Sequence, residues 1–215
     1  MEDNVFNTQY DVTKKSRLVK FYDSNKIVIF SFLLILLIML ASITYYLSVV
    51  EKKKVRLSEN YISAKINIEN GNKDVALNIL KKIIFENDPT YSTLSFFLIL
   101  DLSLISDDKE VLVLYDHLLE NNKFDKKFKN LLIYKKALFS SNLITESELL
   151  EITKPLLNSD NLWKPHALLL LGDYFISKGE SIKAIEFYQQ ILSINNLSKD
   201  FYQRAKSQLD IITNE

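Results

Sequence analysis

The chain has 215 residues, of which 47% are apolar, and its 27 basic residues balance 27 acidic ones. The zero net charge argues against a nucleic-acid-binding footprint, and the absence of cysteine excludes disulfides, thiolate chemistry and cysteine-based zinc sites. Three glycines and three prolines are too few for the many turns of a sandwich or barrel, so the composition predicts an all-α fold.

The N-terminal part of the chain predicts a membrane anchor. Residues 1–26 carry no folded-domain pattern, and we expect a short, basic, loosely ordered tail. Residues 27–50 contain no charge, and as a helix they would extend about 36 Å, enough to cross a hydrocarbon core of ~30 Å. Tyr45 and Tyr46 lie near the far end, where aromatic rings prefer the interface. We therefore predict a transmembrane helix over residues 27–50.

Two alternatives concern this segment. A cleaved signal peptide would have a shorter apolar region ending in a small-x-small site, whereas this one is long and is followed by Glu51 and three lysines. The flanking charges leave the orientation open, because five basic residues precede the segment and four follow it. These are Lys14, Lys15, Arg17, Lys20 and Lys26 before it, and Lys52, Lys53, Lys54 and Arg56 after it.

Residues 51–215 predict a series of helices, because apolar residues recur at spacings of three and four. Helix hairpins with turns at Gly71, Asp107, Asn142 and Gly179 would be spaced by 36, 35 and 37 residues. Thr145 and Glu148 have the spacing of a capping box, and Pro165 suits a first helical turn. A last helix over residues 198–212 would cap the stack.

The glycines indicate the kind of hairpin. Gly172 lies in mid-helix, where glycine costs about 1 kcal/mol relative to alanine, so we expect a neighbouring helix to approach it closely. Gly179 suits a turn with positive φ, and Ala184 is the small residue expected on the second helix. Gly71 and Ala76 are five residues apart, as are Gly179 and Ala184. This spacing is typical of tetratricopeptide repeats of about 34 residues; an irregular helical bundle with chance spacing is the alternative.

When the first helix of each predicted hairpin is aligned on its turn, corresponding positions predict a groove for protein partners. Its apolar row comprises Tyr61, Phe97, Leu132 and Leu169, and its charged row comprises Lys65, Asp101, Lys136 and Asp173. The two rows are four residues apart and thus share a helix face. In the alternative interpretation the apolar row is core and the charged row is merely solvated, because amphipathic helices produce such rows anyway.

Catalytic chemistry is not indicated. The sequence lacks phosphate-binding, metalloprotease and nucleophile-elbow motifs, and His117 and His166 are the only histidines. We therefore predict no enzyme activity, catalytic residue, cofactor, metal site, small-molecule substrate or nucleic-acid partner. Trp163, before a predicted helix, is expected to be a packing anchor.

The order of these elements resembles the bacterial YfgM-like tetratricopeptide family. The resemblance is carried by residues near the C-terminal end: Asn161-Leu162-Trp163, the stretch from His166 to Gly172, Gly179, Ala184, residues 187–192 and Gln203-Arg204-Ala205. It implies an ancillary subunit of the Sec translocon in the bacterial inner membrane. The single-pass chain would have its C-terminal domain in the periplasm and contact the translocation channel and periplasmic chaperones.

Two functions therefore remain as expectations. The first is a membrane-anchored adaptor that binds proteins through a helical-repeat groove. The second is a structural or assembly scaffold of the cell envelope or division machinery, which the same fold would serve equally well.

Overall fold

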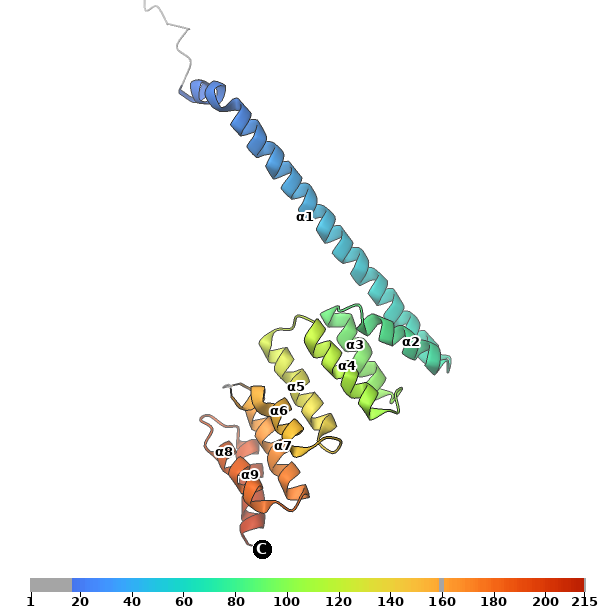
Figure 1. Ribbon diagram of the computed structural model, residues 1–215, viewed down its shortest axis with the longest axis vertical. Coiled ribbons are helices and arrows are strands. Elements are labelled where there is room, and N and C mark those ends of the chain that lie inside the picture. The colour runs from blue at the N-terminus through green and yellow to red at the C-terminus, as the bar shows by residue number, and fades with distance from the viewer. Residues whose placement is uncertain (1–16, 159–160, 215) are drawn as a thin grey trace, which may run out of the picture. The chain divides into compact units, whose positions relative to one another are not determined.

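A computed structural model of the protein describes residues 17–158 and 161–214 (Figure 1). Within these residues the chain is helical between short connections and forms no strand, so the predicted all-α fold class is confirmed. The chain divides into two compact units, residues 1–56 and residues 57–215. The helices are α1 (Arg17–Glu69), α2 (Lys73–Ile84), α3 (Pro89–Asp101), α4 (Asp108–Asn121), α5 (Lys126–Ser140), α6 (Glu146–Leu157), α7 (Lys164–Ser177), α8 (Ser181–Leu192) and α9 (Lys199–Thr213).

Helix α1 contains the apolar segment and is long and apolar enough to cross a membrane. It begins at Arg17, so the expectation of a loosely ordered tail is wrong for residues 17–26, while residues 1–16 lie outside the described residues. Ser42 and Thr44 donate their hydroxyl protons to the carbonyls four residues earlier, at 2.8 and 2.9 Å. Both side chains thus have a hydrogen-bond acceptor within the helix, which is the arrangement that lipid surroundings require.

The second unit has two hydrophobic cores along its chain. The first unites the end of α1 with α2, α3, α4 and part of α5, and includes the buried Leu57, Leu80, Phe96 and Tyr115. Burial raises the pKa of Tyr115 to about 12, and its ring meets Phe96 edge-on at 4.4 Å between centroids. This contact joins α3 to α4 through large side chains rather than through close backbone approach.

Helices α2 and α3 pack more closely than α3 and α4, although the predicted hairpin joins α3 to α4. The reason is the small polar face of α3. Ser92 and Ser95 are fully buried, and the Ser92 hydroxyl lies 3.1 and 3.0 Å from the carbonyl oxygens of Ile83 and Ile84 at the end of α2. The Ser92 hydroxyl thus provides a hydrogen-bond donor for the last carbonyls of α2, which lack partners within their own helix.

The second core contains residues of the five helices from α5 through α9. The closest packing in it is between α7 and α8. A Cβ added to Gly172 would lie 2.5 Å from Cε1 of Tyr188. Tyr188 is fully buried, and its hydroxyl donates to Asp173 at 2.7 Å. The expected close approach at Gly172 is therefore confirmed, but the neighbour is the Tyr188 ring rather than Ala184, which is buried one turn earlier on α8.

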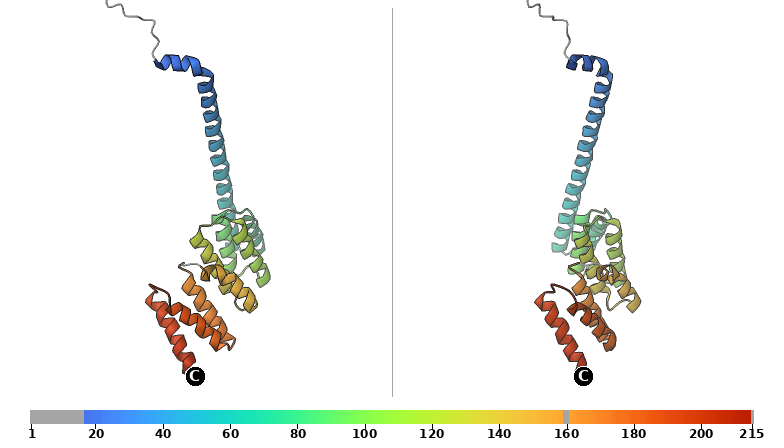
Figure 2. Two further views of the ribbon diagram at one scale, coloured as in Figure 1. Left: turned by 60° about the vertical axis from the view of Figure 1, so that its left-hand side comes forward. Right: turned by 90° about the vertical axis from the view of Figure 1, so that its left-hand side faces the viewer.

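Local signals set the helix ends where the sequence places them. Gly71 and Gly179 adopt φ of +80° and +74° at the ends of α1 and α7. The predicted capping box is present: the Thr145 amide donates to Glu148 at 2.8 Å, and the Glu148 amide donates to Thr145 at 3.4 Å. The Thr145 backbone bond lowers the pKa of the Glu148 carboxyl. Pro165 lies in the first turn of α7, and α9 closes the series (Figures 1 and 2).

Replacing Gly172 by alanine tests the α7–α8 contact. The new methyl group must displace a buried ring whose hydroxyl is hydrogen-bonded, and overpacking of this kind costs about 1–3 kcal/mol. The gain in helix propensity, ~1 kcal/mol, offsets part of this cost. We expect Gly172→Ala to lower the free energy of unfolding by up to about 2 kcal/mol, measured by urea titration of the full chain in detergent micelles with Trp163 fluorescence.

The matched control is the same substitution in a Tyr188→Leu background. The smaller side chain removes the ring that the methyl group would meet, so Gly172→Ala should there be neutral or stabilising. Equal destabilisation in both backgrounds would contradict the contact.

Candidate interaction surface

Of the four residues in the predicted apolar row, two are buried in the hydrophobic cores and two are half-buried. Leu132 is 0% exposed in the first core and Leu169 is 6% exposed in the second. Their assignment to a partner-binding groove is therefore wrong, because apolar side chains at these positions gain more from burial than from exposure. Tyr61 and Phe97 are half-buried and pack against the first core. Burial, followed by the nearby Asp101 carboxylate, raises the pKa of Tyr61.

The predicted charged row is at the surface, with different partners at each position. Lys65, Asp101 and Asp173 are exposed. Lys136 is half-buried and forms an ion pair with Asp116 of α4. Both residues line a cavity of about 330 Å³ between α4, α5 and α6, together with the carboxylates of Glu148 and Glu151.

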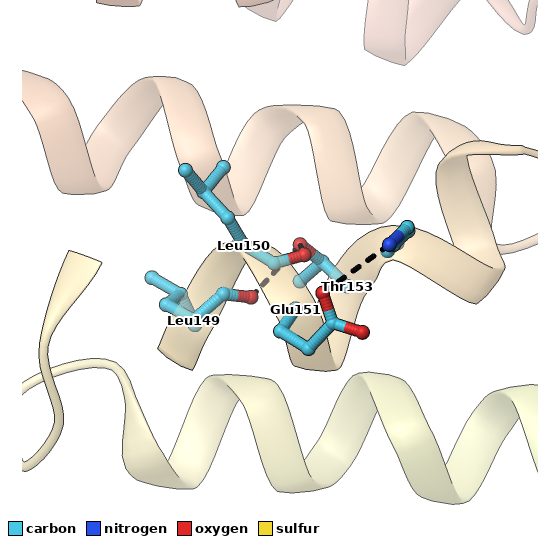
Figure 3. A network of polar contacts seen from close by, with 5 residues as sticks. Leu149, Leu150, Glu151 and Thr153 are labelled. Carbon is cyan, nitrogen blue, oxygen red and sulfur yellow. Dashed lines mark hydrogen bonds and ion pairs between the residues drawn. The ribbon is translucent and has the colours of Figure 1, made fainter. Parts of the chain in front are cut away.

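Polar contacts on α6 beside this cavity stay within the helix (Figure 3). The Thr153 hydroxyl bonds to the carbonyl oxygens of Leu149 and Leu150 at 2.9 and 3.1 Å. Lys154 and Glu151 are 3.4 Å apart and both exposed, and such pairs contribute little to stability. These contacts satisfy polar groups within α6, and none of them joins α6 to another helix.

An aromatic cluster joins α5, α7 and α9. The His166 ring lies between Tyr134 of α5 and Phe201 of α9, at centroid distances of 5.3 and 4.6 Å. Trp163 stacks on Tyr134 at 5.6 Å with an interplanar angle of 22°, and its indole N–H donates to the carbonyl of Lys127 at 3.2 Å. All four rings are only partly buried, so the cluster packs three helices and also reaches the surface.

Charged groups surround this cluster. Asp173, two turns beyond His166 on α7, accepts the Tyr188 hydroxyl. Arg204 of α9 is exposed and, among the described residues, makes no hydrogen bond or ion pair. Burial is the main cause that lowers the pKa of His166, and the positive charge of Arg204 lowers it further. Arg204 likewise acts on the phenols of Tyr134 and Tyr188, so its charge lies close to the aromatic rings.

We call this surface the α5/α7/α9 face. It comprises Tyr134, Trp163, His166, Asp173, Phe201 and Arg204. Partly exposed aromatic rings beside an exposed guanidinium have the composition of protein-binding sites, where aromatic residues and arginine are enriched. Only Asp173 belongs to the groove predicted from sequence. A clue to the others was present, since Trp163 is the only tryptophan and Arg204 the only arginine after residue 56.

Comparison with known proteins gives no match to a family model, to a curated protein or to a solved structure. Among the described residues, no group of three or more His, Asp or Glu side chains is arranged to hold a metal ion.

The pH dependence of stability tests the environment of His166. Because burial lowers its pKa below the ordinary 6.5, the unfolded chain binds the proton more tightly than the folded one. The stabilising effect of the neutral ring is complete above pH 6.5 and is lost as the pH falls through that value toward the folded-state pKa. The difference in unfolding free energy between wild type and His166→Gln should therefore shrink between about pH 7.5 and about pH 5.5. A difference that stays constant across this range would contradict a buried, neutral imidazole.

Proposed function

We propose that the protein is a membrane-anchored adaptor whose tetratricopeptide-like domain binds protein partners through the α5/α7/α9 face. The observation that carries the proposal is the exposed guanidinium of Arg204, which has no hydrogen-bond or ion-pair partner among the described residues, beside partly exposed aromatic rings. Such a surface supplies both of the residue types that dominate protein-binding hot spots. Tethering to a membrane raises the local concentration of the domain, so weak contacts suffice for recruitment.

The anchor is supported by α1. Its apolar side chains from Ile27 to Val49 are largely exposed, its length and composition suit a membrane span, and the Ser42 and Thr44 hydroxyls bond within the helix. A cleaved signal sequence is the competing interpretation of such a helix near the N-terminus. An intact α1 in the mature protein, seen by mass spectrometry of the membrane fraction, would separate the two.

The tetratricopeptide-like assignment is supported by the helix order. In chain order the helices can be grouped as four pairs followed by the closing α9, and the last two pairs, α5 with α6 and α7 with α8, pack closely. Gly71 and Gly179 have positive φ at corresponding turns, and Ala76 and Ala184 are both fully buried five residues later. The unequal packing of α2 on α3 and α3 on α4 makes the N-terminal pairs less regular.

The partners are proposed from the family resemblance. Trp163, His166 and Arg204 carry part of that resemblance, and the same residues lie on the α5/α7/α9 face. On the resemblance alone, we propose that the domain lies in the periplasm and contacts the Sec translocation channel and periplasmic chaperones. A reporter that is active only in the periplasm, fused after Glu215, should be active; activity of a cytoplasm-only reporter at that position would exclude this location.

Site-specific photo-crosslinking in intact membranes tests the binding face. A crosslinking amino acid at Arg204 should capture a translocon or chaperone component. The matched control is Lys206, also exposed on α9, because residues two apart on a helix point to nearly opposite sides. We expect capture at position 204 and at least a several-fold weaker product at position 206. Equal products at both positions would contradict the face, and division or envelope-assembly proteins at position 204 would replace the translocon assignment by the scaffold alternative.

A further inference from the structure

The first turns of α1 carry an apolar face that a membrane span over residues 27–50 does not explain. Val19, Phe21 and Tyr22 expose 43%, 63% and 45% of their surfaces, although they precede that segment. Figures 1 and 2 show that these first turns run in a different direction from the rest of α1. The exposed apolar side chains therefore lie on a short helical segment set at an angle to the span.

Two side-chain contacts accompany the bend. The Asn25 side-chain amide donates to the backbone carbonyl of Phe21 at 3.0 Å, four residues earlier. The rings of Tyr22 and Phe30, on either side of Asn25, meet edge-on at 6.5 Å between centroids. The first turns of α1 therefore contact the start of the apolar segment through an aromatic pair.

The first turn of this segment is amphipathic. At 3.6 residues per turn, Phe21, Tyr22 and Val19 span an arc of about 160°, and Lys20 and Ser24 lie on the opposite arc, with Asp23 at its edge. Asn25 and Lys26 fall within the apolar arc at the end of the segment, and Lys26 directly precedes the apolar residues. Exposed aromatic rings opposite one lysine, with a second lysine where the span begins, suit a helix that lies in the lipid headgroup region.

We propose that residues 19–26 of α1 bind the surface of the bilayer, with Phe21 and Tyr22 toward the acyl chains, Lys20 on the opposite side toward anionic headgroups, and Lys26 at headgroup level where the segment meets the span. This inference rests on the proposed membrane span. Lipid is the occupant because the segment is covalently continuous with the span, so the membrane surface lies beside it wherever the span inserts. The bend directs the helix along that surface, and the lysines complement the negative charge of acidic phospholipids.

The absence of cysteine allows a direct test. Single variants Val19→Cys, Ser24→Cys, Leu36→Cys and Ser177→Cys in the full chain would carry a spin label in vesicles of phosphatidylcholine and phosphatidylglycerol. Collision rates with oxygen and with a nickel complex report depth. Leu36 should be deep, Val19 at the level of the headgroups and upper acyl chains, Ser24 shallower than Val19, and Ser177 aqueous.

The outcomes separate this inference from the anchor itself. An aqueous Leu36 would show that the span is absent, so both proposals fail. A deep Leu36 with Val19 as aqueous as Ser177 would overturn the surface segment alone. A deep Leu36 with Val19 shielded from both reagents would show that protein, rather than lipid, covers this face.

The anionic preference has its own control. The double variant Lys20→Glu/Lys26→Glu should raise the collision rate of the nickel complex at Val19 about twofold in acidic vesicles. Lys52→Glu/Lys53→Glu, beyond the other end of the apolar segment, should leave that rate unchanged. An equal depth of Val19 in acidic and neutral vesicles, for wild type and variant alike, would overturn the role of the lysines.

Discussion

The contact between the Tyr188 ring and the backbone at Gly172 is the constraint on which the C-terminal half of the protein depends. Helices of 12 to 15 residues, like α5 to α9, are marginal in isolation and gain their stability from packing. A residue without a side chain allows α8 to place a full aromatic ring against α7. The same tyrosine then donates to Asp173, so one contact both pairs the helices and orients a carboxylate of the α5/α7/α9 face.

The helix boundaries were predictable because their causes are local. Glycine at positive φ, a capping box at Thr145 and a proline in the first turn of α7 act over a few residues, and each is present in the structure. The partner of Gly172 was not predictable in the same way. A mid-helix glycine indicates that something approaches, but the choice of Tyr188 over Ala184 depends on the rotation of α8. The close packing of α2 on α3 through Ser92 likewise depends on tertiary structure and has no local sequence signal.

The proposed interaction surface was less predictable than the fold. Sequence register placed Leu132 and Leu169 on a groove, yet the structure buries both, because amphipathic spacing alone does not distinguish a core row from a surface row. The aromatic cluster joins Tyr134 to His166 and Phe201 across three helices, and no local pattern reports such a juxtaposition. The rarity of Trp163 and Arg204 in this composition was the only available indication. The helix that is long and apolar enough to cross a membrane, by contrast, was predictable from the composition of one continuous segment.

Hydrogen exchange of the full chain in bilayers, followed by mass spectrometry, tests most directly whether the α7–α8 contact holds the C-terminal half together. The account predicts that amides of α7 and α8 are the slowest to exchange in residues 126–213 and that both helices open together. Independent opening of α7 and α8, or faster exchange there than in α5 and α6, would contradict it.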